Sequence, residues 1–182
     1  MGCGSNTNTA ERTFFTKEDS ITDTYLTLQD TLHNAWNILI KDESQKVKDL
    51  NTLVEHLMMG DQFEKSTLTS LDERIHQLVN IRITPKSLAN PYVVDEYDFA
   101  CNSIVAEVLA LAETKPELMT DKYVQKLVDN IRNADQRVSL FRENYDSIAE
   151  LFNSFLESNR EMLKEIDRKF NLEKRPLFKG SD

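Results

Sequence analysis

Two short motifs place an acidic residue three positions before a histidine, and both residue types bind divalent metals. They are Asp30-x-x-His33 and Glu73-x-x-His76, and each resembles half of the carboxylate–histidine motif of di-metal sites in helical bundles. If the helices that carry them turn back at Gly60, the two histidines lie about 16 Å apart along the bundle axis. One metal ion cannot be reached from both, so the pattern favours solvated or edge histidines. We therefore expect no metal site and no cofactor.

A second group of polar residues flanks a long apolar stripe in the last third of the chain. It consists of Asp135, Arg137, Arg142 and Tyr145, and the last two are three residues apart on one helical face. We expect an ion-pair and hydrogen-bond network that fixes the register of neighbouring helices. A ligand-binding role is the alternative, although ion pairs on helix surfaces are common and individually weak.

The two cysteines differ in their surroundings, and no disulfide framework follows from them. Cys101 falls on an apolar helical face and is expected in the core, because no histidine lies near it to activate a thiolate. Cys3 follows Gly2 in a stretch of small polar residues, which resembles the start of a mature bacterial lipoprotein. We expect lipid attachment at Cys3. Dual acylation of Gly2 and Cys3, or an unmodified thiol, are the alternatives.

The elements that must position these groups are helices. From Tyr123 to Phe155 the apolar residues recur in alternating steps of three and four, as in a coiled coil, and such a stripe needs partner helices to cover it. The stripe consists of Val124, Leu127, Ile131, Ala134, Val138, Phe141, Tyr145, Ile148, Phe152 and Phe155.

A similar stripe begins after Thr16, which is expected to cap the first helix, and it is interrupted between Leu39 and Val47. In the interruption the inward position is Glu43. A polar layer inside the bundle is one interpretation, because such a layer can fix register or bind a ligand. A solvent-facing stretch or a local slip of the stripe is the simpler interpretation.

The complete pattern predicts an all-α fold, an elongated antiparallel four-helix bundle with a short extra C-terminal helix around Met162–Phe170. None of the four prolines interrupts a strong apolar stripe, so each marks a boundary between helices. We expect a flexible N-terminal tether at residues 1–15, the bundle at residues 16–178 and a loose tail at residues 179–182.

Composition restricts the partners. The net charge of −9 argues against nucleic acid, which requires a clustered positive surface. It also argues against purely electrostatic attachment to anionic lipid. Since no apolar run approaches the ~20 residues needed to cross a bilayer, any membrane attachment is expected to be covalent.

Taken together in order and spacing, several segments resemble the LemA family over residues 21–178. In its last long helix that family carries an acidic residue, an Asn-Arg-Ile motif, an arginine and two Tyr-Asn pairs. The matching segments are Asp135–Val138, Arg142, Tyr145–Asp146 and Phe152–Asn153, with Leu109–Glu113, Pro116–Leu118 and the tail Arg175–Phe178 around them and Tyr25, Ala35–Trp36, Leu53–Val54 and Glu64 upstream. The chain departs from the family pattern at Gln45–Lys46, Asp49–Asn51 and Asn159–Arg160.

The resemblance implies a long antiparallel helical bundle held at a membrane and implies no particular activity. The family's N-terminal membrane helix is absent, and a lipid on Cys3 would replace it. We therefore expect a non-catalytic, membrane-tethered protein on the extracytoplasmic face of a bacterial membrane, with a scaffold role and an unidentified protein partner. The alternative is a soluble, cytoplasmic helical bundle that binds a small ligand or metal between its helices, motivated by Asp42–Glu43 and the two acid–histidine pairs.

Overall fold

The computed structural model describes residues 14–81 and 83–179, and within these ranges the chain is helical with no strands. The four α-helices are α1 (Lys17–Met58), α2 (Lys65–Asn80), α3 (Pro91–Glu113) and α4 (Lys122–Ile166). Two single turns of 3-10 helix, η1 (Ser87–Ala89) and η2 (Leu118–Thr120), precede α3 and α4. The all-helical class expected from the sequence is thus confirmed. None of these helices is both long and apolar enough to span a bilayer.

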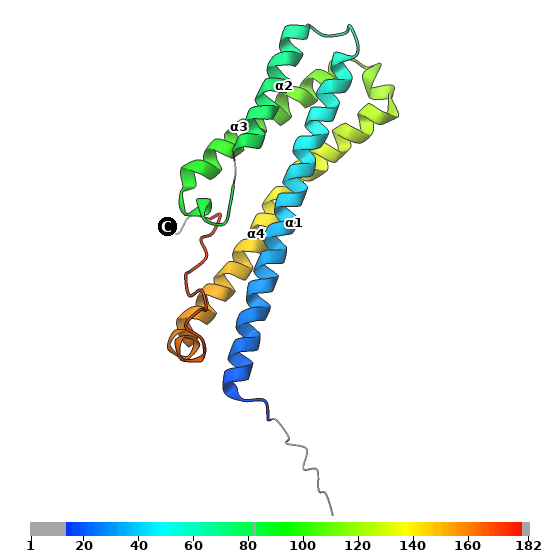
Figure 1. Ribbon diagram of the computed structural model, residues 1–182. Helices are drawn as coiled ribbons and strands as arrows, with labels where there is room; N and C mark the ends of the chain where they lie inside the picture. The colour runs from blue at the N-terminus through cyan, green and yellow to red at the C-terminus, as the bar shows by residue number, and fades with distance from the viewer. Residues whose placement is uncertain (1–13, 82, 180–182) are drawn as a thin grey trace, which may run out of the picture.

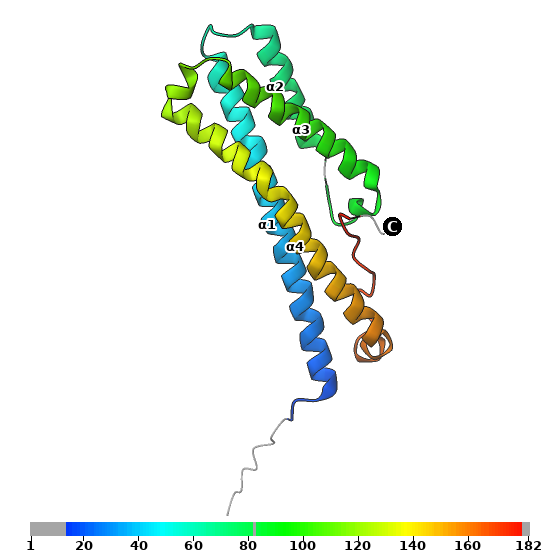
Figure 2. The same cartoon turned by 180° about the vertical axis from the view of Figure 1, so that it is seen from behind.

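The molecule is elongated because α1 and α4 lie side by side with opposite chain directions (Figure 1). The shorter helices α2 and α3 cover this pair at one end only, as the reverse view in Figure 2 also shows. At the other end the chain after α4 runs back along the pair as an extended tail, towards the connection between α2 and α3.

Local sequence signals determine where the helices begin. Thr16 caps α1 in a capping box with Asp19, as predicted, so that each side chain accepts a backbone N–H from the other residue. Asn90 caps α3, in which Pro91 occupies the first turn, and Asp121 caps α4. Each cap satisfies a backbone donor that the helix itself leaves free.

The apolar core comprises three clusters of buried residues along the helix pair, and the C-terminal tail packs on two of them. The first, here called the four-helix core, contains buried residues of all four helices: Leu50, Leu53, Val54, Leu57, Leu68, Leu71, Ile75, Leu78, Tyr97, Cys101, Ile104, Val105, Val108, Ala112, Val124, Leu127, Val128 and Ile131. The other two, here together called the tail-covered core, contain Ile21, Tyr25, Leu32, Ala35, Leu88, Val94, Tyr145, Ala149, Phe152, Leu156 and Leu163, with Phe170, Leu172, Leu177 and Phe178 of the tail packed on them.

Six of the predicted positions on α4 are buried, namely Val124, Leu127, Ile131, Ala134, Tyr145 and Phe152. The other four, Val138, Phe141, Ile148 and Phe155, are half-buried, and beyond Tyr145 the neighbouring residues Ala149 and Leu156 are buried instead of Ile148 and Phe155. A straight α-helix has 3.6 residues per turn, so a strict repeat of 3.5 drifts around its surface over several heptads. The drift moves the contact line by one residue.

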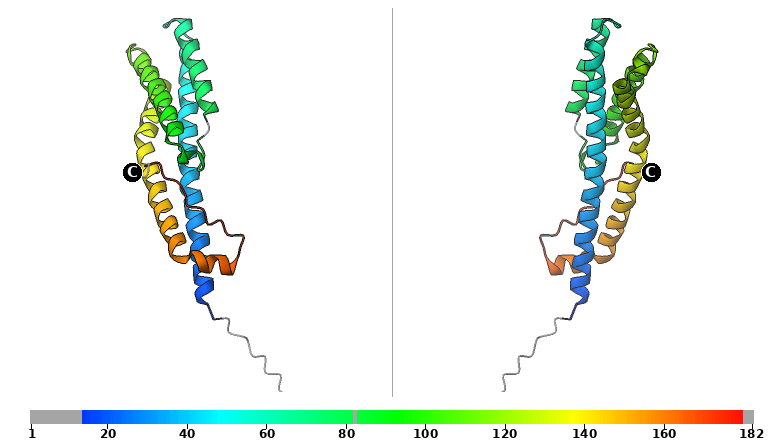
Figure 3. Two further views of the ribbon diagram at one scale, coloured as in Figure 1. Left: turned by 90° about the vertical axis from the view of Figure 1, so that its left-hand side faces the viewer. Right: turned by 90° about the vertical axis from the view of Figure 1, so that its right-hand side faces the viewer.

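The separate short C-terminal helix expected around Met162–Phe170 is not formed. Instead α4 continues without a break to Ile166, because Leu163 extends its buried stripe, and Phe170 lies beyond its end. Figure 3 shows the last turns of α4 bent aside from the long axis. Phe170 follows the end of α4 and packs on Tyr25 of α1, with ring centroids 4.6 Å apart.

Candidate functional site

A layer of buried polar residues lies on α1 beside the four-helix core. Glu43 and Lys46 are only 8% and 2% exposed, and Lys46 Nζ lies 3.1 Å from Glu43 Oε1. The Tyr97 hydroxyl of α3 donates a hydrogen bond of 2.8 Å to Glu43 Oε2. The simpler expectation, a solvent-facing stretch, is therefore wrong, because α3 brings Tyr97 opposite Glu43 and covers it.

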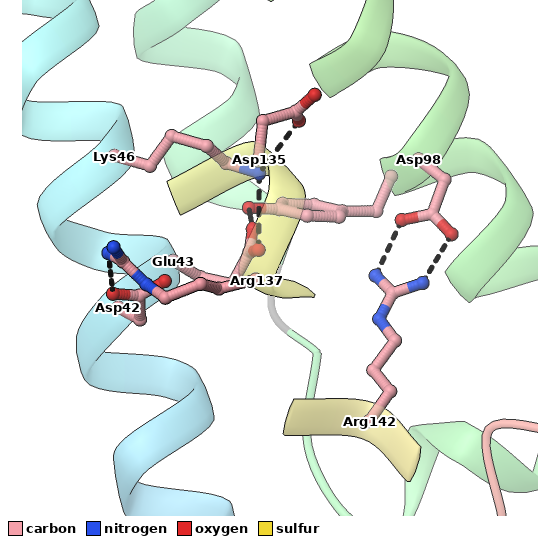
Figure 4. Close-up of polar contacts among 8 residues, drawn as sticks. Asp42, Glu43, Lys46, Asp98, Asp135, Arg137 and Arg142 are labelled. Carbon is pink, nitrogen blue, oxygen red and sulfur yellow. Dashed lines mark hydrogen bonds and ion pairs between the residues drawn. The ribbon is translucent and has the colours of Figure 1, made fainter. Parts of the chain in front are cut away.

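The layer extends to α4 through Asp135. Figure 4 shows Lys46 between Glu43 and Asp135, with the ammonium directed at both. Lys46 Nζ is 3.6 Å from Asp135 Oδ1, and Asp135 is partly exposed. One buried ammonium thus connects α1 with α4, while the carboxylate beside it connects α1 with α3. The charged and polar groups of such a layer pair best at one axial register of the helices, so the layer favours that register.

The protonation states of these groups follow from their burial and their neighbours. Burial opposes the charge on Lys46 and is the largest single effect, but the interactions with Glu43, Cys101 and Asp135 together outweigh it, so that the pKa of Lys46 is raised. Burial, and then the Glu43 carboxylate, raise the pKa of the Tyr97 hydroxyl. Burial also raises the pKa of the Cys101 thiol, although Lys46 opposes this effect. Cys101 is therefore a buried thiol and not an activated nucleophile.

Two further ion pairs join the helices beside this layer. Arg142 of α4 binds Asp98 of α3 through two hydrogen bonds of 2.7 and 2.6 Å, and Arg137 Nη2 lies 2.7 Å from Asp42 Oδ1 of α1 (Figure 4). A bidentate pair orients both side chains as well as attracting them. The Arg142 guanidinium also lies over the Phe178 ring, 4.9 Å from its centroid. Arg142 thereby contacts the C-terminal tail.

Tyr145, the fourth residue predicted for this network, lies elsewhere. Its ring packs edge-on against Trp36 at 5.4 Å and against Phe178 at 5.7 Å. Its hydroxyl is buried and has no hydrogen-bond partner among the described residues. The structure therefore brings Asp135, Arg137 and Arg142 into interhelical pairs and places Tyr145 in the tail-covered core.

Several residues of the polar network were not singled out from the sequence. Tyr97 is on the apolar stripe of α3, and only the carboxylate opposite it reveals its polar role. Asp146 follows Tyr145 on α4 and accepts the backbone N–H groups of Phe178 and Lys179 at 2.8 and 3.1 Å. No local pattern identifies such a residue, since its partners are more than 30 positions away.

The two acid–histidine pairs remain separate surface features. His76 is exposed and faces Asp72 on its own helix, with 3.5 Å between Nδ1 and Oδ1. His33 lies on α1 at the edge of the tail-covered core. In the described ranges no three His, Cys, Asp or Glu side chains are arranged to hold a metal ion. Cys3, the predicted lipid attachment site, lies outside the described residues.

A comparison with known families finds a match that covers most of the chain. The model described as LemA family matches residues 36–182. No curated protein matches the chain. The match includes the whole polar layer, the Arg142–Asp98 pair and the C-terminal tail, so these features belong to the part of the chain that the family model describes.

Proposed function

We propose that this chain, which belongs to the LemA family, is a non-catalytic, membrane-tethered protein that binds another protein through its helical surface. In this proposal its four helices form an elongated antiparallel bundle that serves as a scaffold. A lipid on Cys3 holds the bundle at the extracytoplasmic face of a bacterial membrane.

The observation that carries the proposal is an exposed aromatic and acidic face on α3. Tyr92 and Phe99 are each 79% exposed, and they are two turns apart on the same side of the helix. Between them lie Asp95 and Glu96, which are both exposed. We call these four residues the α3 face. Large exposed aromatic residues that share a face are typical of protein-binding surfaces.

The charge of α3 indicates what kind of partner fits. The helix contains five acidic residues and no lysine or arginine. Three of the acids pair with arginines of neighbouring helices: Asp98 with Arg142, Glu107 with Arg74 and Glu113 with Arg132. Among the described residues, no ion pair involves Asp95 or Glu96.

A basic protein segment suits this arrangement. Lysine or arginine can bind the two carboxylates and stack on an aromatic ring at the same time. The fit therefore favours a partner with basic residues flanked by apolar ones, and it disfavours nucleic acid, whose phosphates would face carboxylates.

The interior of the molecule supports a role without catalysis. Glu43, a buried side chain with potential for acid–base chemistry, is bonded to Lys46 on its own helix and to Tyr97 of α3, and all three residues are almost completely buried. The polar atoms of this group are already paired with one another, which favours a role in fixing helix register.

The tether is tested by the intact mass of the protein isolated from membranes of its native host. We expect a lipid-bearing Cys3 in the membrane fraction and release of a Cys3→Ser variant to the soluble fraction. An unmodified wild-type N-terminus in the soluble fraction would contradict the tethered role.

The α3 face is tested by a photo-crosslinking residue placed at Phe99 in the native host. We expect a defined adduct with a basic protein, and we expect it to be lost when Asp95→Asn and Glu96→Gln are added. The matched control is the same crosslinker at Leu151, which is exposed at 62% on α4. Identical adducts from both positions would show that the α3 face is not the binding surface.

A further inference from the structure

A cavity of about 430 Å³ lies where the tail meets the helices. Its walls come from α1, from α4, from the α2–α3 connection at Pro85 and from the tail at Arg175. This volume is within the range of small-molecule sites, roughly 300–1,000 Å³. The cavity is separate from the polar layer around Glu43 and does not depend on the α3 face, so it goes beyond the proposed function.

One wall of the cavity is apolar and well supported. Leu32, Trp36 and Pro85 lie on it. The Trp36 ring lies between Tyr145 and Phe178. It meets Tyr145 edge-on and stacks on Phe178, with ring centroids 6.1 Å apart and an angle of 17° between the ring planes. These contacts fix the orientation of the indole, so the wall can receive a flat apolar group without first becoming ordered.

The tail supplies a cation in a fixed position. Both backbone groups of Arg175 are bonded to Asn153, with the N–H donating at 2.7 Å and the carbonyl accepting at 2.8 Å. The guanidinium lies over the Phe152 ring, 5.3 Å from its centroid. Within the described ranges no carboxylate forms an ion pair with Arg175. Its hydrogen-bond donors are thus available to an anionic group.

The cavity also has an anionic group and an unused hydroxyl. Asp30 of α1 lines it, one turn before His33, and no ion pair within the described ranges involves Asp30. Tyr145 also lines the cavity, and its hydroxyl is buried without a hydrogen-bond partner among the described residues. Burial raises the pKa of Tyr145 to about 12, against the opposing effect of Arg175, so the hydroxyl keeps its proton at neutral pH.

We propose that this cavity binds a small zwitterion with a flat apolar group, the class to which aromatic amino acids belong. The carboxylate of the ligand binds Arg175 and the ammonium group binds Asp30. The ring lies against Trp36 and Leu32. A purely anionic ligand would face Asp30, and a purely cationic one would face Arg175, so only a zwitterion satisfies both charges.

The chain contains its own reporter for this site, because Trp36 is its single tryptophan. The experiment titrates the full-length protein with phenylalanine and follows tryptophan fluorescence excited at a wavelength that phenylalanine does not absorb. Two probes serve as matched controls, namely 3-phenylpropanoate, which lacks the ammonium group, and 2-phenylethylamine, which lacks the carboxylate. We expect saturable binding of phenylalanine at least about tenfold tighter than of either probe, as expected for losing one charge-assisted hydrogen bond.

Two substitutions test the assignment of each charge. Arg175→Gln is expected to weaken the binding of phenylalanine about tenfold without weakening that of 2-phenylethylamine. Asp30→Asn is expected to weaken the binding of phenylalanine without weakening that of 3-phenylpropanoate. The controls are Arg168→Gln and Asp23→Asn, which change exposed charges outside the cavity and should leave all three affinities unaltered. A variant that only loosened the tail would weaken the binding of phenylalanine and of both other probes together. That result would overturn the assignment of the ligand carboxylate to Arg175 and of its ammonium group to Asp30.

The proposal is overturned if phenylalanine leaves Trp36 fluorescence unchanged, or if the three probes bind equally well. Loss of the crosslinked adduct at the α3 face would leave these titrations untouched, so the two proposals fail separately.

Discussion

The two cores of this protein are closed by different means. The four-helix core is covered by α2 and α3, whose backbone groups are already paired within their own helices. The tail-covered core is closed on one side by an extended segment, which has no internal hydrogen-bond ladder. The first therefore requires apolar side chains of suitable size, whereas the second also requires polar side chains at specific positions.

Individual side chains bind the backbone of the tail. Asp146 accepts two N–H groups, and Asn153 pairs with both backbone groups of Arg175. The Tyr25 hydroxyl donates to the carbonyl of Asn171 at 3.0 Å, and Arg160 donates to the carbonyl of Leu172 at 3.1 Å. Each bond satisfies a backbone group that would otherwise lack a partner. The extended tail is therefore held on the helices by individual polar contacts.

The largest effect is expected in the polar layer between the two cores. Lys46→Met leaves the buried Glu43 carboxylate without its cation and should lower the free energy of unfolding by about 3–5 kcal/mol, measured by denaturant titration. Adding Glu43→Gln removes the unpaired charge and keeps an acceptor for Tyr97, so the double variant should recover at least half of the loss. A single variant as stable as wild type would show that the layer contributes nothing to stability.

Within the four-helix core a truncation should act on the whole fold. Leu71 is completely buried on α2, so Leu71→Ala removes apolar burial and leaves a cavity, at a cost of about 2–5 kcal/mol. The matched control is Leu151→Ala on the exposed side of α4, which should change stability by no more than about 0.5 kcal/mol. Hydrogen exchange would show whether the destabilisation extends over the whole fold, since amides of both cores should then lose protection in Leu71→Ala.

Alkaline pH should affect the tail-covered core through Tyr145. Its pKa rises from the ordinary 10.0 to about 12 in the folded protein, so folding favours the protonated hydroxyl. This stabilisation is complete below pH 10 and is lost as the pH rises through about 12, by roughly 2–3 kcal/mol. We expect Tyr145→Phe to reduce the slope of unfolding free energy in this window. An unchanged slope would rule out Tyr145 as a source of the alkaline sensitivity.

Removing a bond to the tail should act locally. Asp146→Ala removes the acceptor of the Phe178 and Lys179 N–H groups and is expected to cost about 1.5–3 kcal/mol, as for hydrogen bonds to charged groups. The amide of Phe178 should exchange faster, while amides of the four-helix core stay protected. Asp129→Ala, at an exposed position of the same helix, is the control. Equal loss of amide protection in both cores would contradict the interpretation that the tail is held locally, by contacts separate from the four-helix core.

The smallest effect is expected at an exposed ion pair. Arg74 and Glu107 join α2 to α3 at the surface of the four-helix core. Their side chains are 34% and 44% exposed, so water screens the pair. Glu107→Gln should change stability by less than about 1 kcal/mol, and added salt should reduce even that difference. A loss comparable to that of Leu71→Ala would mean that this core also depends on polar contacts.

The sequence by itself determined the features that depend on neighbours along the chain. The helical class, the cap at Thr16 and the buried positions of α4 as far as Ala134 all follow from spacing, because helix periodicity and capping act over a few residues. Cys101 in the core follows for the same reason. The local repeat was wrong by one residue at Ile148 and Phe155, where a small drift per turn accumulates, and it did not predict that α4 continues to Ile166.

Only the tertiary structure decided which polar groups meet. Glu43 is separated from Tyr97 by 54 positions and Tyr25 from Asn171 by 146, so no local pattern relates them. The same holds for the cavity between Asp30, Trp36 and Arg175, whose walls come from distant parts of the chain. The physical reason is that periodicity specifies which side of a helix is buried, whereas the partner of each buried polar group depends on the axial register and on the path of the tail.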